Sequence, residues 1–290
     1  MMATKIAGAP ISWGVCEVPG WGHQMGRERV LAEMRELGLG ATEAGPDGFL
    51  PDDPNELREL LSASEMTLAS GFTPLVLHGK WRAQLQAVAR RFHAGGADII
   101  VLAAATGLDD YDARPQLTEA DWTRVLRALD HARHVAGEHG LRVALHPHYG
   151  TIVETPEEIE RVLDGCDVPL CLDTGHVALG GGDPVAIARQ APERIAHLHL
   201  KDVDADLAAQ VVAGTLTFSD AVRSGVFLPL GHGDIDLHSV LADVHGAGYD
   251  GWYVFEQDAK LEQEPQDDGG PRENVARSLA FLEGALLTTP

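Results

Sequence analysis

Four residues with metal-binding side chains stand at the ends of apolar segments: His146, Asp173, His199 and Glu256. Successive members of this set are 26 to 57 residues apart, which is too far for a local finger or a single binding loop. In a barrel of alternating strands and helices, the carboxyl ends of all strands open on one face, so ligands from four strands can surround one ion. The pattern therefore predicts a divalent-metal centre together with the fold that builds it.

This prediction depends on the set rather than on any one member. An aspartate that opens a turn is usually a helix N-cap, and a lone histidine at a strand end is usually structural. Two imidazoles and two carboxylates favour Mn²⁺ or Co²⁺, with Fe²⁺, Zn²⁺ or Mg²⁺ as alternatives, over Ca²⁺, which prefers oxygen ligands only. The open coordination positions would let a polyhydroxy ketone bind through its carbonyl and a neighbouring hydroxyl.

Four further residues carry groups suited to proton transfer: Lys201, Glu43, His148 and His176. A lysine that is partly buried and drawn towards a cation would have a lowered pKa, so Lys201 would act as acid or base near neutral pH. The alternatives are a plain surface lysine at position 201 and, for Glu43, a carboxylate that only supports the ligands. We predict that these four residues share the roles of base, acid and substrate contact.

Two tryptophans near the start of the chain, Trp13 and Trp21, flank the segment GVCEVPG. Such indoles can form an apolar wall for a ring, although a tryptophan beside a loop is as often simple packing. Glu17 lies between them and is a weaker candidate for the same wall. These three residues, with His232 in a later glycine-rich turn, are predicted to contact the substrate.

Eight short apolar segments would form the strands that position these residues. Segments with helical periodicity, for example Trp122, Val125 and Leu129, separate most of them, and this alternation is typical of βαβ units. We predict one α/β domain over residues 1–290, a (β/α)₈ TIM barrel with the metal site at the C-terminal face of the strands. The segments are KIAGAPISW, GATEAG, TLASGF, DIIVLAA, RVALHPH, PLCLDTGH, IAHLHLKD and WYVFEQD.

Two stretches exceed what a minimal barrel needs. Residues 203–233 follow the seventh apolar segment and are predicted to form an extended loop, and residues 262–274 form an acidic loop before the last helix. Long loops on the catalytic face commonly carry substrate specificity, so both stretches are candidates for that role.

The composition excludes several kinds of partner. A formal net charge of -22 and a pI of about 4.9 argue against a nucleic acid or an anionic membrane, because phosphate binding needs clustered Lys and Arg. Three cysteines without a CxxC pair favour a reducing compartment, and the first residues lack the regions of a signal peptide. We expect a cytoplasmic protein. A homo-oligomer is compatible with a barrel, but no segment indicates an interface.

Several motifs resemble the xylose-isomerase-like TIM barrels: APISWG, ATEAGPDGFLP, HPHYGTIVET, LDTGH, HLHLKDV and the tract FSDAVRSGVFLPLGHGDIDL. That superfamily contains divalent-metal sugar isomerases, epimerases and relatives of endonuclease IV. The resemblance runs nearly end to end and is closest to the inosose dehydratases. It implies a metal-dependent carbon–oxygen lyase that removes water from a keto-inositol, 2-keto-myo-inositol, through an enolate and loss of the β-hydroxyl.

The resemblance also separates this chain from some relatives. Ketose 3-epimerases of the superfamily use two metal-bound glutamates, one of them from the fifth strand, where this chain has His146. The loss of that carboxylate argues against two-base epimerisation. The run His146-Pro147-His148 replaces the more usual three histidines, and His232 stands where an aspartate is common, so both departures bear on which substrate is bound.

Two alternatives remain open at this level. One is a keto-sugar isomerase or epimerase, or a lyase acting on a related keto-glycoside, which product analysis would separate from a keto-inositol dehydratase. The other is a catalytically silent barrel that binds a sugar or serves as a complex subunit, because a fold does not determine a function. A DNA-repair endonuclease is disfavoured by the charge of -22 and by the lack of a basic stripe.

Overall fold

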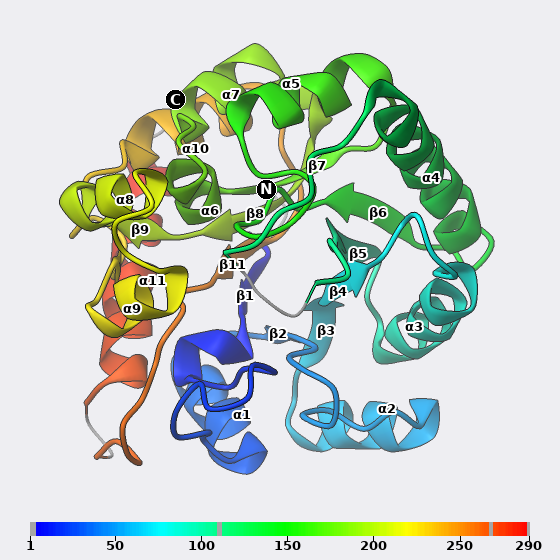
Figure 1. Ribbon diagram of the computed structural model, residues 1–290. Helices are drawn as coiled ribbons and strands as arrows, with labels where there is room; N and C mark the ends of the chain where they lie inside the picture. The colour runs from blue at the N-terminus through cyan, green and yellow to red at the C-terminus, as the bar shows by residue number, and fades with distance from the viewer. Residues whose placement is uncertain (1–3, 109–111, 267–268, 289–290) are drawn as a thin grey trace.

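The computed structural model of the chain describes residues 4–108, 112–266 and 269–288. At its centre is a nine-stranded parallel sheet in the order β3-β2-β1-β11-β8-β7-β6-β5-β4, ringed by helices (Figure 1). Each of the eight predicted apolar segments contains a strand. The strands are β1 (Ile6–Gly8), β2 (Ala41–Glu43), β3 (Thr67–Ser70), β4 (Phe72–Leu75), β5 (Ile99–Ala104), β6 (Arg142–Leu145), β7 (Leu170–Asp173), β8 (Ile195–Leu200) and β11 (Tyr253–Phe255).

The barrel closes where its third strand is interrupted by a single glycine. β3 pairs with β2, whereas β4, which follows directly after Gly71, pairs with β5. An ideal Cβ at position 71 would lie 2.6 Å from both Ala44 Cβ and Phe92 Cζ, so this approach requires glycine. The extended chain therefore pairs with β2 before Gly71 and with β5 after it, and this change of partner joins the two edges of the sheet. The predicted (β/α)₈ TIM barrel is confirmed.

Helices cover the outside of the barrel. Thr118 begins α4 with a capping box, in which its Oγ1 accepts from Asp121 N at 3.3 Å while Asp121 Oδ2 accepts from Thr118 N at 2.9 Å. No helix in the described ranges has both the length and the apolar composition needed to cross a bilayer. The surrounding helices are α1 (Arg27–Glu36), α2 (Pro54–Ala63), α3 (Arg82–Gly95), α4 (Glu119–Gly137), α5 (Pro156–Gly165), α6 (Thr174–Leu179), α7 (Pro184–Gln190), α10 (Leu237–Gly246) and α11 (Pro271–Thr288).

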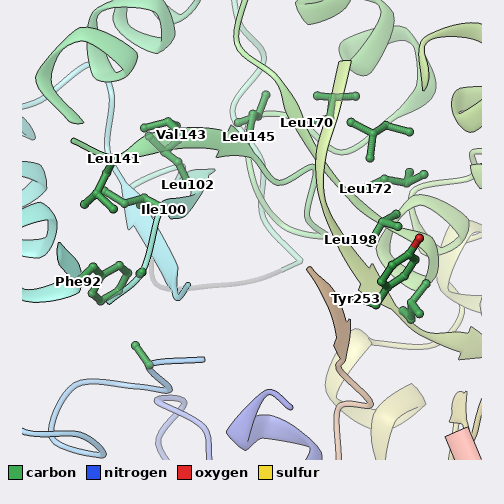
Figure 2. Close-up of a cluster of buried hydrophobic side chains, with 14 of the residues drawn as sticks. Phe92, Ile100, Leu102, Leu141, Val143, Leu145, Leu170, Leu172, Leu198 and Tyr253 are labelled. Atoms are coloured by element: carbon green, nitrogen blue, oxygen red, sulfur yellow. The ribbon is translucent and has the colours of Figure 1, made fainter. Parts of the chain in front are cut away.

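The two faces of each strand have different surroundings. Ile100 and Leu102 of β5 belong to the main hydrophobic core between strands and helices, together with Phe92 of α3 (Figure 2). The alternate residue Val101 belongs to a separate small cluster with Ala144 of β6. Because side chains alternate along a strand, the same segment builds the outer core with one face and the barrel interior with the other.

Residues 203–233, predicted to be an extended loop, instead fold into two helices and a small antiparallel sheet. α8 (Ala205–Val212) and α9 (Phe218–Arg223) lie between β9 (Asp202–Val203) and β10 (Phe227–Leu228), which pair with each other (Figure 1). Apolar residues three and four apart give these helices a buried face, which packs against Trp21 and against Leu179 of α6. The resulting cluster contains Trp21, Leu179, Val203, Ala208, Val211, Phe218, Ala221, Val222, Val226 and Phe227.

The acidic segment 262–274 is only partly a loop, because α11 begins at Pro271. Its residues 267–268 lie outside the described part of the chain. Before them, Glu264 Oε1 is 2.5 Å from Arg29 Nη1, and Leu261 forms an isolated antiparallel bridge with His23. The segment is therefore attached to the residues around the start of α1.

Candidate metal centre

The four predicted metal ligands meet at the carboxyl ends of four strands. Asp173 ends β7, His199 lies near the end of β8, and His146 and Glu256 directly follow β6 and β11. Asp173 Oδ2 is 3.1 Å from His146 Nε2 and 3.5 Å from His199 Nδ1. His199 Nδ1 is in turn 2.6 Å from Glu256 Oε2. The parallel register, in which His199 lies opposite both Asp173 and Val254, brings the set together inside the protein.

The contact between His199 and Glu256 indicates that the set fits a cation. A neutral Nδ1 and a carboxylate oxygen are both acceptors, so at 2.6 Å they repel unless a proton or a metal ion lies between them. Burial opposes a proton on His199, but the carboxylates of Glu256 and Glu43 raise its pKa well above the usual value. Potential ligand atoms of Asp173, His176 and Glu256 also lie within 4.8 Å of one another. The donor set therefore suits a divalent metal, and His176 adds an imidazole to it.

Lys201 occupies the middle of the carboxylates rather than the surface. Its fully buried ammonium is 2.5 Å from Glu256 Oε1 and 3.0 Å from both Asp173 Oδ2 and Asp258 Oδ1. Burial opposes the charge, yet Asp173, Asp258 and Glu256 raise the pKa of Lys201 well above its ordinary value. The predicted lowering of this pKa is therefore wrong for these surroundings, because three anions outweigh desolvation. Gly175 leaves room for the side chain, since an ideal Cβ there would lie 2.6 Å from Lys201 Cβ.

Asp258 is a member of the site that the sequence interpretation missed. Burial, opposed by Lys201 and reinforced by Glu256, raises the pKa of this carboxyl to about 6. Its Oδ2 is 3.9 Å from His176 Nε2. The available signal was its position two residues after Glu256, because residues at that spacing on extended chain point to the same side. Glu256 itself has its pKa lowered to about 2, because His199 and Lys201 overcome the effect of burial.

Glu43 is held at the back of the site by three donors. Its Oε1 lies 3.1 Å from His199 Nε2 and 3.3 Å from His197 Nε2, and Ser70 Oγ donates to it in a short hydrogen bond. Burial would raise the pKa of Glu43, but His199 and His197 hold it well below its usual value. The carboxylate is thus charged and fixed in direction. Ser70 and His197 were not singled out from the sequence.

His148 and His176 lie together beside the predicted metal ligands. Their rings stack with centroids 3.7 Å apart, and His148 Nδ1 is 2.7 Å from the carbonyl of Tyr149. Burial lowers the pKa of His148 to about 3 and that of His176 well below its usual value. Both imidazoles are therefore neutral near neutral pH. His148 faces the pocket described below, whereas His176 lies between His148 and Asp258.

A pocket of about 210 Å³ opens onto this cluster. Glu43, His148, Glu256 and Asp258 contribute the polar part of its lining. Apolar side chains from the loop after β1, from β4 and from α9 form the walls, among them Ile11, Val15, Val18, Trp21, Phe72 and Phe218. Such a cavity, with apolar walls and a few converging polar groups, has the character of a small-molecule site.

The predicted substrate contacts divide into two groups. Trp21 and Glu17 line the pocket, and Trp21 is held by a 2.9 Å hydrogen bond from Nε1 to the carbonyl of Ala259. Trp13 is fully buried in the hydrophobic core, where its Nε1 donates to Glu33 Oε2 at 2.7 Å. It does not line the pocket, so the packing alternative describes its position.

His232 also lies away from the pocket lining. Asp202 Oδ2 accepts from Gly231 N and Gly233 N, both at 2.9 Å, and this buried carboxylate shapes the turn. An ideal Cβ at Gly233 would lie 2.4 Å from Asp202 Oδ1, so the close approach needs glycine. The His232 side chain is left exposed at the turn. The structure therefore separates this predicted contact from the cavity.

Comparison with known proteins agrees with this architecture. A protein-family model described as xylose isomerase-like TIM barrel matches residues 31–284. The rhizopine catabolism protein MocC of Rhizobium meliloti is 35% identical over 91% of this chain and 83% of its own length. An inosose dehydratase of Geobacillus kaustophilus (strain HTA426) is 34% identical over 90% of this chain and 88% of its own length. The solved structure of IolI with a bound zinc atom, 14% identical, has a TM-score of 0.71 and covers 99% of both chains, a likeness of fold alone.

These similarities define both the class of protein and its family. Proteins named as dehydratases match about nine-tenths of the chain, and the chain is accordingly an enzyme of the carbon–oxygen lyase class. The cluster of buried imidazoles and carboxylates at the strand ends fits the divalent metal expected from the sequence. The chain belongs to the xylose isomerase-like TIM barrel family.

Proposed function

We propose that the protein is a divalent-metal-dependent dehydratase acting on a keto-inositol, with 2-keto-myo-inositol as the substrate. The observation that carries this proposal is the polar end of the pocket, where Glu43, His148, Glu256 and Asp258 border one cavity with apolar walls. Such walls would bury a carbocyclic ring while the polar groups contact its carbonyl and hydroxyls. The inosose dehydratases among the similar proteins support the choice of substrate.

The charge balance of the site supports a dication. The site holds four carboxylates and one buried lysine, Lys201; three of the carboxylates contact this lysine, and the fourth, Glu43, contacts His199 instead. Buried charge of one sign is costly unless it is compensated. The four predicted ligands, His146, Asp173, His199 and Glu256, would hold Mn²⁺ or Co²⁺, as the mixed imidazole and carboxylate set favours. A bound ion would supply Lewis-acid polarisation of the substrate carbonyl. The four carboxylates are those of Glu43, Asp173, Glu256 and Asp258.

The chain's own residues would move two protons. A base takes the proton α to the carbonyl, and a general acid protonates the β-hydroxyl as the carbon–oxygen bond breaks and water leaves. The resulting enol relaxes to a dione. Glu43 and His148 line the cavity and carry no proton to give near neutral pH, so we assign substrate contact and removal of the α-proton to them. Asp258 also lines the cavity, and because its pKa is raised to about 6, its protonated form would give the proton to the leaving hydroxyl. Lys201 and His176 would act through their neighbours, Lys201 by holding the carboxylates and His176 by packing on His148.

The proposal is tested by product analysis. The protein loaded with Mn²⁺ or Co²⁺ is incubated with 2-keto-myo-inositol in D₂O, with a ketohexose in parallel, and proton NMR spectra are recorded. Asp173→Asn is the control for contaminating activity. Formation of the dehydrated dione by the wild type alone supports the lyase. Deuterium incorporation or a new epimer without water loss would move the assignment to an isomerase or epimerase. Binding of the ketone without exchange of its α-proton for deuterium would move the assignment to a silent sugar-binding barrel.

A further inference from the structure

The two ring nitrogens of His199 have different surroundings. Nδ1 is 2.6 Å from Glu256 Oε2 and 3.5 Å from Asp173 Oδ2, whereas Nε2 is 3.1 Å from Glu43 Oε1. A neutral imidazole offers one lone pair, and the hydrogen bond made by one nitrogen determines which nitrogen can bind a metal. The position of Glu43 Oε1 therefore decides that Nδ1 is the nitrogen available to the proposed ion.

Ser70 and His197 hold that oxygen in place. Ser70 Oγ donates to Glu43 Oε1, and His197 Nε2 is 3.0 Å from Ser70 Oγ and 3.3 Å from Glu43 Oε1. Both Ser70 and His197 are fully buried, Glu43 is 3% exposed, and only Glu43 of the three lines the pocket. A buried carboxylate oxygen that accepts from three donors cannot turn without leaving polar groups unpaired.

A local irregularity in the sheet turns the Ser70 side chain towards Glu43 and His197. The register between β2 and β3 shifts at Thr42/Glu43, so that Thr42 lies opposite Leu68 and Glu43 lies opposite Ser70. Ala69 packs in the cluster with Ala41, and strict alternation would send the next side chain to the opposite face. Bulges of this kind redirect a side chain. The irregularity thus places the Ser70 hydroxyl on the Glu43 carboxylate.

We propose that Ser70 is a positioning residue, which through Glu43 Oε1 keeps the proton of His199 on Nε2 and leaves Nδ1 to bind the metal ion. The inference rests on the proposed function, because it takes His199 to be a metal ligand. Ser70 itself touches neither the pocket nor any of the four predicted ligands in the described contacts. Its loss should therefore weaken metal binding without removing a ligand.

The test compares Ser70→Ala with Thr42→Val. Thr42 is the matched control, because its fully buried hydroxyl donates at 2.8 Å to the backbone carbonyl of Glu43 and not to the carboxylate. Zn²⁺ affinity is measured by competition with a chromogenic chelator, and the His199 tautomer in the Zn²⁺-loaded protein by long-range ¹H–¹⁵N NMR. We expect Ser70→Ala to weaken Zn²⁺ binding by about 10- to 100-fold, as for other groups that support a ligand, and Thr42→Val to leave it unchanged.

The outcomes separate this inference from the proposed function. Equal Zn²⁺ affinity in Ser70→Ala and the wild type, or coordination through His199 Nε2, would overturn the positioning role. A second zinc ion per chain that Glu43→Gln removes would also overturn it, by making Glu43 a ligand. If His199→Ala binds Zn²⁺ as tightly as the wild type, the metal assignment itself fails. Circular dichroism checks that each variant folds. If Ser70→Ala does not fold, Ser70→Cys replaces it. A thiol is a weaker hydrogen-bond donor than a hydroxyl, so we expect Ser70→Cys to lose less Zn²⁺ affinity than Ser70→Ala would.

Discussion

The two ends of the barrel interior are built on different physical principles. Towards the amino ends of the strands, Ile99, Val101 and Ala144 are fully buried in an apolar cluster, and Cys171 of the same cluster has its sulfur beside the rings of His146 and His199, at the boundary between the two ends. Only two residues beyond Cys171, Asp173 lies in a cluster of carboxylates, imidazoles and one ammonium. The first end is stabilised by removing apolar surface from water, whereas the second buries charges, which costs free energy unless each is paired.

This contrast indicates where stability and chemistry reside in the same strands. In barrels of this type, residues at the amino ends serve packing, and residues at the carboxyl ends serve catalysis. A substitution at the amino end should therefore change unfolding without changing turnover. A substitution at the carboxyl ends of the strands, the polar end of the barrel interior, should change metal binding and activity more than packing.

The largest effect is expected for Asp173→Asn. It removes charge from an oxygen that contacts His146, His199 and Lys201. We expect kcat/KM on 2-keto-myo-inositol to fall on the order of 10³-fold, together with metal affinity, because this carboxylate would be both ligand and counterion. Kinetics and metal titration measure the effect. Near-normal turnover with full metal content would show that the polar end does not work as proposed.

Lys201→Met should have the largest effect on stability before any metal is added. It leaves Glu256, Asp173 and Asp258 buried without their shared cation. Removing one partner of a buried ion pair costs about 3–5 kcal/mol, so urea unfolding in the presence of EDTA should show a loss of this order. Added Mn²⁺ should restore more stability to this variant than to the wild type. An unchanged unfolding midpoint in EDTA would contradict the ion-pair account.

Metal removal from the wild type should have an intermediate effect. A ligand that binds only the folded state stabilises it by about 2.7 kcal/mol at a concentration 100 times its Kd. Thermal unfolding with Mn²⁺, compared with EDTA, should show a higher midpoint, and activity lost in EDTA should return with Mn²⁺ or Co²⁺. Ca²⁺ is the control, because a site with imidazole ligands suits it poorly. An identical midpoint in Mn²⁺ and EDTA would argue against a metal bound at the polar end.

The smallest effect is expected at the amino end, for Ile99→Val. Ile99 is fully buried in the apolar cluster at the start of β5, far along the strands from the carboxylates. Loss of one methylene should cost about 0.5–1.5 kcal/mol in urea unfolding, because the remaining cavity is small. Metal affinity and kcat should stay as in the wild type. A clear fall in metal affinity would mean that the two ends are coupled, which the comparison above does not predict.

Part of the site was predictable because it depends on local pattern. His197 and His199 fall on one face of a strand through the two-residue period, and Asp173 ends an apolar run. Once such strands alternate with helices, barrel closure alone brings His146, Asp173 and His199 to one face. The contacts of Ser70 and Asp258 were not predictable in this way. They depend on a register shift and on the side chains of strands distant in sequence.

Other differences have a similar origin. Trp13 and Trp21 have the same chemistry and lie near one another in the chain, yet one fills the core and the other lines the pocket. The helices α8 and α9 were expected as a loop because the partners of their apolar faces, including Trp21 and Leu179, come from other parts of the chain. Neither outcome follows from the residues alone.

The sequence by itself determined the strand segments, the residue types of the candidate site and the face on which these residues meet, because strand periodicity and barrel connectivity are local or topological properties. Only the tertiary structure decided the charge balance. A buried lysine would ordinarily have a lowered pKa, but Lys201 has a raised one, because three carboxylates surround it, one at the end of β7 and two after the end of β11. Electrostatic energy depends on distances between charges after packing, and spacing along the chain does not specify those distances.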